Sequence, residues 1–210
     1  MKSISLFSGG KDSFLAAVIA MEQGFEIVTT VTVDSTMDSM MFHVPNNNIA
    51  GDVASLLGLK NIRISEEGFR EEIGRIVHET GAQALISGAI ASNYQKSRIE
   101  RLCTELGIIS YTPLWLLNQE TELDAVISSG IKAMLISLSA DGLGEEYLGG
   151  ILDGKLVEDL KKIRERHGIN ISGEGGEYES LVVSYLSNKL QIKSFKDTWT
   201  GNTGTRIVTV

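Results

Sequence analysis

Hydrophobic and polar positions alternate in a regular order over the first half of the chain. Short runs rich in apolar and β-branched residues predict five strands, at 4–7, 25–33, 61–64, 84–86 and 108–111. Between them, apolar residues recur at helical spacing in the segments 14–21, 49–57, 69–77 and 94–106. This alternation of strand and helix is typical of βαβ units that share one parallel sheet. The segment 37–48 has weak periodicity and is predicted to be a loop.

The pattern changes after about residue 115. A helix is predicted at 120–129, a strand at 132–138 and a charged helix at 155–167. The last segments are predicted to be strands separated by turns, at 181–186, 189–195 and 206–210. We therefore expect an α/β domain over residues 1–118 and a smaller α+β domain over residues 119–210.

Composition limits the classes of protein to which the chain can belong. Of its 210 residues, 42% are hydrophobic and 22% are charged, which is ordinary for a globular protein with a buried core. No window approaches the roughly 20 apolar residues of a membrane-spanning helix, and the N-terminus lacks the pattern of a signal peptide. The net charge of −8 argues against general nucleic-acid binding. We expect a cytoplasmic protein whose single Cys103 is a core residue.

The segment Ser8–Ser13 lies where the first predicted strand passes into the first predicted helix. Its two glycines let backbone N–H groups approach an anion, and the start of the helix adds a partial positive charge. Ser8 and Ser13 add hydroxyl donors, and Lys11 adds an ammonium. The spacing differs from that of a Walker A loop and of a dinucleotide-binding loop. A phosphate-binding loop is the favoured interpretation, with a capped glycine turn as the alternative.

These six residues, Ser-Gly-Gly-Lys-Asp-Ser, resemble the phosphate loop of the PP-loop, or N-type, ATP pyrophosphatases. The resemblance implies a five-stranded parallel sheet of the Rossmann-like adenine nucleotide α-hydrolase type, with ATP at the carboxyl ends of the strands. It also implies that Asp12 lies near a Mg²⁺ ion bound to the pyrophosphate. The residues expected to bind ATP are Ser8, Gly9, Gly10, Lys11, Asp12, Ser13, Asp34, Ser35, Gly88 and Ala89.

Four further segments, at 41–46, 88–100, 113–119 and 173–180, narrow this resemblance. Together they resemble the diphthine–ammonia ligase family over nearly the whole chain, with small departures at Asn93 and Ser180. That family makes the last amide of diphthamide, a modified histidine of translation elongation factor 2. The resemblance implies ATP-dependent amidation of diphthine on this factor with ammonium, through an acyl-adenylate, with release of AMP and pyrophosphate.

Two of these segments offer ligand contacts on physical grounds as well. Gly88 and Ala89 follow a predicted buried strand, where small residues would let a base or ribose approach the backbone. The polar residues after them open a helix and offer donors to phosphates or a carboxylate, with a solvated helix face as the alternative. His43 either orients substrate or caps a loop. The substrate-binding candidates here are His43, Asn93, Tyr94, Gln95, Lys96 and Arg98.

Three carboxylates surround two glycines in the segment 174–179, just before a predicted strand. Such a group suits Mg²⁺, a cationic substrate or ammonium, or it removes a proton from an ammonium ion. Glutamates that point outward from a polar turn are the alternative. We expect substrate contacts from Gly175, Gly176, Tyr178 and Glu179. The catalytic candidates are Lys11, Asp12, Glu174 and Glu177.

Two other functions are compatible with the sequence. A PP-loop ATP pyrophosphatase could adenylate a different carboxylate, and a protein of this fold could bind ATP or AMP as a sensor without catalysis. The single cysteine disfavours sulfur transfer by a cysteine pair, and 210 residues leave no room for a glutaminase domain. Free ammonium is therefore the simplest nitrogen source, with delivery by a separate partner subunit as the alternative. The sequence leaves a homodimer open and indicates neither a membrane nor a nucleic-acid partner.

Overall fold

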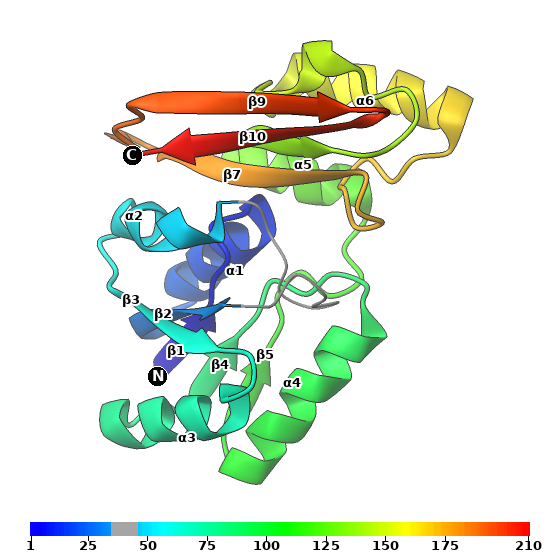
Figure 1. The fold of residues 1–210 in the computed structure, drawn as a ribbon. Helices are drawn as coiled ribbons and strands as arrows, with labels where there is room; N and C mark the ends of the chain where they lie inside the picture. Colours follow the sequence, from blue (N-terminus) through cyan, green and yellow to red (C-terminus); the bar gives the residue numbers. More distant parts are fainter. Residues whose placement is uncertain (35–45) are drawn as a thin grey trace.

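A computed structural model describes residues 1–34 and 46–210 of the chain (Figure 1). Two of the expected ligand-binding residues, Ser35 and His43, lie outside the described residues, as does most of the motif 41–46. Among the helices that are described, none combines the length and the apolar character needed to cross a lipid bilayer.

The first half of the chain forms a five-stranded parallel sheet with the order β3-β2-β1-β4-β5, which confirms the expected fold. Its strands are β1 (Lys2–Leu6), β2 (Glu26–Asp34), β3 (Asn61–Ser65), β4 (Ala84–Ile86) and β5 (Ile109–Tyr111). The chain runs outward from β1 in both directions, so the switch point of the sheet lies between β1 and β4. Ligands of open α/β sheets bind at such a point, outside the carboxyl ends of the strands.

Helices cover both faces of this sheet (Figure 1). The helices α3 (Phe69–Thr80) and α4 (Asn93–Leu106) lie on one face, and α1 (Lys11–Glu22) and α2 (Ala50–Ser55) lie on the other. Side chains of α3 and α4 form a core with β1 and β2, which includes the buried Cys103. The helix α1 is buried along most of its length, because it lies between this sheet and a second one.

The second sheet is antiparallel, with the order β8-β7-β6-β10-β9. Its strands are β6 (Ile131–Leu138), β7 (Tyr178–Tyr185), β8 (Asn188–Lys189), β9 (Ser194–Thr200) and β10 (Thr203–Thr209). Short 3₁₀ turns, η1 and η2, occur at Asn47–Ile49 and Glu145–Tyr147. The remaining helices are α5 (Gln119–Ser128) and α6 (Gly154–His167).

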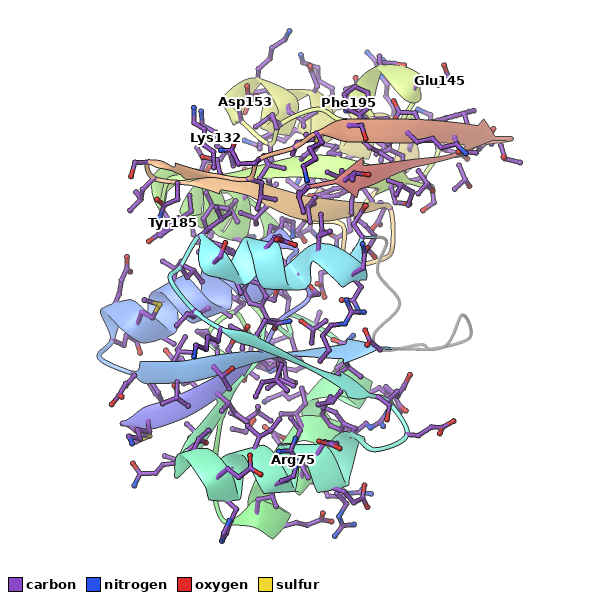
Figure 2. The ribbon with its side chains drawn as sticks, turned by 60° about the vertical axis from the view of Figure 1, so that its left-hand side comes forward. Arg75, Lys132, Glu145, Asp153, Tyr185 and Phe195 are labelled. Carbon is purple, nitrogen blue, oxygen red and sulfur yellow. The ribbon has the colours of Figure 1, made fainter. Side chains whose placement is uncertain are left out.

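Contacts between the two halves surround α1. Tyr185, at the end of β7, points toward the layer of α1 and α2 (Figure 2), and its ring centroid lies 5.2 Å from that of Phe14. The backbone N–H of Val182 donates to the carbonyl of Gly9 at 2.9 Å. The phosphate loop is therefore joined directly to the second sheet. The division into domains at 1–118 and 119–210 stays a prediction.

The strand predicted at 189–195 is wrong. The strand β8 ends at Lys189 and β9 begins only at Ser194. In the segment between them, Leu190 and Ile192 pack against the core while the backbone forms no ladder. Alternating apolar residues in a loop that packs on the core thus gave the same pattern as a strand.

Candidate active site

A cavity of about 480 Å³ lies at the carboxyl ends of β1 and β4 and extends to the start of β7. Its walls come from the phosphate loop, from the loop between β4 and α4, and from residues 172–180. Ligand pockets in proteins have volumes of about 300–1,000 Å³. The cavity therefore has the size of a small-molecule site and is built from both halves of the chain.

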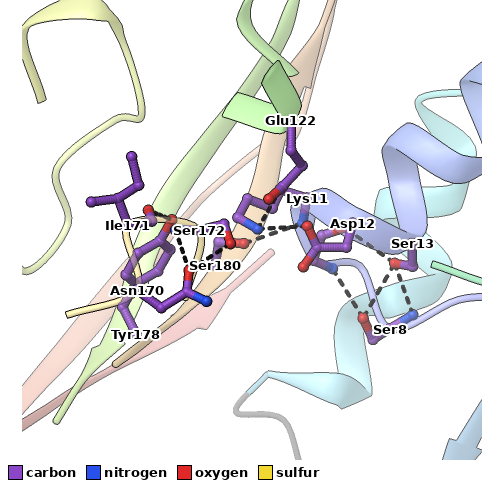
Figure 3. A network of polar contacts seen from close by, with 11 residues as sticks. Ser8, Lys11, Asp12, Ser13, Glu122, Asn170, Ile171, Ser172, Tyr178 and Ser180 are labelled. Atoms are coloured by element: carbon purple, nitrogen blue, oxygen red, sulfur yellow. Dashed lines mark hydrogen bonds and ion pairs between the residues drawn. The ribbon is translucent and has the colours of Figure 1, made fainter. Parts of the chain in front are cut away.

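Hydrogen bonds within the loop hold the phosphate-binding segment in shape. Gly9 has a φ of +84°, a conformation that favours glycine. The N–H of Ser8 donates to Ser13 Oγ at 3.2 Å, and Ser13 Oγ donates to the carbonyl of Gly10 at 3.1 Å (Figure 3). The N-cap residue of α1, Gly10, makes no side-chain cap, and the N–H of Lys11 in the first turn donates to Ser180 Oγ at 3.2 Å. The following N–H groups of that turn remain able to bind an anion.

Gly88 brings the loop after β4 into contact with the start of α1. A Cβ atom at Gly88 would lie 2.7 Å from both the carbonyl carbon of Asp12 and the backbone nitrogen of Ser13. The sequence led us to expect that the glycine makes room for a base or ribose, but the close neighbour in the structure is the backbone of α1. Gly88 and Ala89 both line the cavity.

Lys11 does not extend its ammonium freely into the cavity. Its side chain is buried, and Nζ donates to Glu122 Oε1 at 2.7 Å and to Asp12 Oδ1 at 2.5 Å (Figure 3). Burial alone would lower the pKa of this ammonium, but the charges of Asp12, Tyr178 and Glu122 outweigh burial and raise it above its ordinary value. Lys11 therefore stays positively charged at the inner wall of the cavity.

Glu122 is the main residue of this region that the sequence did not reveal. It lies on α5 and its side chain has 0% exposure; burial raises the pKa of its carboxyl, while the ammonium of Lys11 favours the charged form. A single glutamate in the polar start of a predicted helix carries no local signal of burial. The buried ammonium of Lys11 requires a counter-charge, and only the fold shows which carboxylate supplies it.

Two glutamates from the segment 174–179 contribute to the wall of the cavity. Glu174 and Glu179 both line it, together with Asp12. Burial, and then the charge of Asp12, raise the pKa of Glu174 and raise that of Glu179 to about 7. Among residues 1–34 and 46–210, no three His, Cys, Asp or Glu side chains form a cluster able to hold a metal ion. The acidic wall suits a cationic group or a proton.

Glu177 and Tyr178 both form hydrogen bonds that hold the local backbone. The carboxylate of Glu177 accepts the N–H of Asn170 and the N–H of Gly175, each at 2.8 Å, and Glu177 does not line the cavity. The hydroxyl of Tyr178 donates to the carbonyl of Ile171 at 2.8 Å, while the residue contributes to the cavity wall. The structure thus separates Glu177 from the catalytic candidates beside which the sequence placed it.

The cavity unites one part of the expected site and leaves another part outside. Asp34 pairs with Arg63 at the surface, and Tyr94 is 61% exposed. Lys96 lies over the ring of Trp115 and pairs with Glu100. The expected residues in the cavity wall are Ser8, Lys11, Asp12, Ser13, Gly88, Ala89, Gln95, Glu174, Gly175, Gly176, Tyr178 and Glu179. The described candidates outside it are Gly9, Gly10, Asp34, Asn93, Tyr94, Lys96, Arg98 and Glu177.

Several serines of the wall were also missed. Ser87, Ser92, Ser172 and Ser180 line the cavity, and the Oγ atom of Ser180 accepts the N–H of Lys11 at 3.2 Å. Ser180 lies 169 residues from Lys11 in the chain. Ser180 belongs to the motif 173–180, but that motif does not show that Ser180 contacts the phosphate loop, because the contact depends on the packing of β7.

Both halves of the chain match models of known protein domains. Residues 1–110 match the model of the diphthamide synthase N-terminal domain, and residues 118–209 match that of the diphthamide synthase C-terminal domain.

Several relatives carry the name diphthine–ammonia ligase. The relative from Danio rerio is 29% identical over 210 residues, a match that covers 87% of this chain and 82% of the relative. The human relative is 28% identical, with 87% and 79% covered. The relative from Schizosaccharomyces pombe is 29% identical, and the chain spans only 34% of its length. With both family models matched in order along one fold, the chain belongs to the diphthamide synthase family.

Proposed function

We propose that this chain is an ATP-dependent diphthine–ammonia ligase, which forms the terminal amide of diphthamide on translation elongation factor 2. The observation that carries the proposal is one cavity, lined by residues of the loop Ser8–Ser13 and by two half-buried glutamates, Glu174 and Glu179. The relatives named diphthine–ammonia ligase supply the identity of the substrate. The two walls of the cavity suit two different tasks in the reaction.

The phosphate-loop wall suits the triphosphate of ATP. The first turn of α1 offers the N–H groups that follow Lys11, and the hydroxyls of Ser8 and Ser13 lie 3.2 Å apart beside it. Lys11 adds a fixed positive charge behind these donors. Such preorganised donors stabilise charge that develops during phosphoryl transfer without any rearrangement. The adenosine would then lie toward the carboxyl ends of β1 and β4.

In the proposed first step, a carboxylate oxygen of diphthine attacks the α-phosphorus of ATP. The bond from that phosphorus to the bridging oxygen breaks, pyrophosphate leaves, and an acyl-adenylate forms. Asp12, which lines the cavity and is partly exposed, is the residue placed to contact a Mg²⁺ ion on the pyrophosphate. That ion would neutralise the charge of the leaving group. The chain itself contributes alignment and fixed charge.

In the proposed second step, ammonia attacks the carbonyl carbon of the acyl-adenylate. The bond from that carbon to the oxygen shared with the phosphate breaks, and AMP leaves with this oxygen. Ammonium must first lose a proton, because the cation has no lone pair. Glu179 is suited to accept it, since burial raises the pKa of this carboxyl to about 7 and a base works best near the ambient pH. Glu174 and Tyr178 complete a recess that suits the quaternary ammonium of diphthine.

The partners follow from this chemistry. Elongation factor 2 presents the diphthine side chain at the cavity, ammonium enters from solution, and the reaction takes place in the cytoplasm. The proposal requires neither a membrane nor a nucleic acid, and it is compatible with a homodimer.

Formation of AMP from ATP tests the proposal. Purified chain, ATP, Mg²⁺ and ammonium are incubated with elongation factor 2 that carries diphthine, and with the same factor lacking the modification. We expect AMP only with the diphthine-bearing factor, and none with the Asp12→Ala variant. AMP formation that is indifferent to the factor would show a pyrophosphatase with another substrate. ATP that is bound but never cleaved would show a sensor.

A further inference from the structure

Glu122 occupies an unusual position for a carboxylate. It lies 111 residues beyond Lys11 in the chain, and its side chain has no exposed surface. Its Oε1 atom accepts from Lys11, and within the described part of the chain Oε2 has no hydrogen-bond partner. Burial of a half-satisfied carboxylate opposes folding. An arrangement of this kind is expected where the charge serves another group.

Lys11 connects Glu122 to Asp12. One ammonium donates to Glu122 on its inner side and to Asp12 on its outer side (Figure 3). The side chain of Asp12 is 31% exposed and lines the cavity, whereas Glu122 is fully buried and does not line it. The position of the ammonium therefore fixes the direction in which the Asp12 carboxylate faces.

The surrounding charges make this anchor necessary. The carboxylates of Asp12, Glu122, Glu174 and Glu179 all interact electrostatically with Lys11, and Nζ lies 5.9 Å from the centre of the Tyr178 ring. Without the charge of Glu122, Asp12 would be the only carboxylate bonded to the buried ammonium. Asp12 would then be drawn inward, away from the cavity.

We propose that Glu122 is a positioning residue, which anchors the Lys11 ammonium and thereby orients the Asp12 carboxylate toward the phosphates of ATP. The inference rests on the proposed function, because it assumes that ATP binds at the phosphate loop. Glu122 itself touches no substrate. Its carboxylate accepts from Lys11, and its charge also repels that of Asp12. Both interactions act on the position of Asp12 and not on the substrate, and this distinguishes positioning from a general contribution to stability.

A cycle of four proteins tests this route: the unaltered chain, Glu122→Gln, Lys11→Met, and the double variant. AMP formation, ATP affinity by calorimetry and the thermal midpoint are measured for each. We expect Glu122→Gln to lower kcat at least tenfold. We expect the double variant to be no slower than Lys11→Met alone, because Glu122 then has nothing left to anchor. Losses that multiply in the double variant would overturn the proposal.

Two further variants separate position from charge and from folding. Glu120→Gln removes the same charge from the exposed side of α5, where Glu120 pairs with Lys161 and Arg164, and should leave kcat unchanged. Glu122→Asp keeps the counter-charge and should recover part of the rate that Glu122→Gln loses. A Glu122→Gln variant with a lower thermal midpoint but the original kcat would show a structural residue only and overturn the proposal.

The same proteins distinguish this inference from the proposed function. If the unaltered chain binds ATP but forms no AMP with the diphthine-bearing factor, the proposed function fails. The cycle is then read from ATP affinity, where losses that do not add still support positioning and losses that add overturn it. If the unaltered chain binds no ATP, both the inference and the proposed function fail.

Discussion

At the scale of single residues, burial and hydrogen-bond partners decide what a carboxylate does. Each carboxylate oxygen of Glu177 accepts one backbone N–H group. Glu179, two positions later, lines the cavity, and burial raises the pKa of its carboxyl to about 7. The sequence grouped the glutamates of 174–179 together because their spacing carries no information about backbone partners. The folded turn at 170–177 shows which glutamate bonds to the backbone and which glutamates line the cavity.

The pH dependence of stability should report the buried carboxyl of Glu179. Its pKa is raised in the folded state, so its protonated form favours folding, and this contribution is lost as the pH rises toward about 7. The difference in unfolding free energy between the chain and Glu179→Gln should therefore fall between about pH 5 and pH 7, by at most about 1.4 kcal/mol per pH unit. Urea unfolding at several pH values measures it. Parallel curves for the two proteins would contradict the prediction.

The Glu177→Gln variant should lose stability while the chemistry survives. An amide can accept through one oxygen only, and bonds to a charged acceptor are stronger than bonds to a neutral one. We expect a loss of about 1–2 kcal/mol in unfolding free energy, with ammonium-dependent turnover retained at temperatures below unfolding. Turnover that disappears in a variant that is fully folded by circular dichroism would return Glu177 to the catalytic residues.

At the scale of elements, the start of α1 is set by what packs against it. The local sequence Ser8–Ser13 was sufficient to predict that this segment joins a strand to a helix, and the structure confirms it; its role in phosphate binding stays a prediction. The local sequence could not show that the loop after β4 touches α1 at Gly88, or that β7 bonds to Gly9 and Lys11. Such contacts join residues far apart in the chain. They depend on the packing of the sheets rather than on local periodicity.

The contact at Gly88 predicts a selective effect of one methyl group. Gly88→Ala would place Cβ 2.7 Å from backbone atoms of Asp12 and Ser13, so α1 must shift. We expect ATP affinity, measured by calorimetry, to fall at least tenfold. Gly51→Ala in α2 is the matched control, because its nearest neighbour would lie 3.7 Å away, and it should gain about 0.5–1 kcal/mol of stability. Unchanged affinity in Gly88→Ala would refute the packing argument.

The connection between β5 and α5 contains a residue that opposes folding. Leu116 has a φ of +57° and is 71% exposed, and its N–H donates to the carbonyl of Ile90. A leucine in the left-handed region costs about 1–2 kcal/mol, which its exposed side chain does not offset by burial. Leu116→Asn should therefore raise the unfolding free energy by about 0.5–1 kcal/mol. A lower thermal midpoint would show that the leucine makes a stabilising contact.

At the scale of the whole molecule, the parallel sheet and most helices followed from periodicity, because each is a local pattern. The candidate site could be predicted less completely from periodicity. Its inner wall needs Glu122 from α5 and Ser180 from β7, both beyond the predicted phosphate-binding domain. One wall contains the loop proposed to bind phosphate and the other is acidic, so the chain assembles its cavity only when the second sheet packs on α1.

The central claim is that the diphthine carboxylate reacts at the α-phosphorus of ATP in this cavity. Its most direct test uses elongation factor 2 whose diphthine carboxylate carries ¹⁸O, with ATP and ammonium, and mass spectrometry of the AMP released. Attack by the carboxylate transfers one of its oxygens to AMP, so we predict AMP that contains one ¹⁸O atom. AMP without the label, or label found in inorganic phosphate instead, would contradict the account.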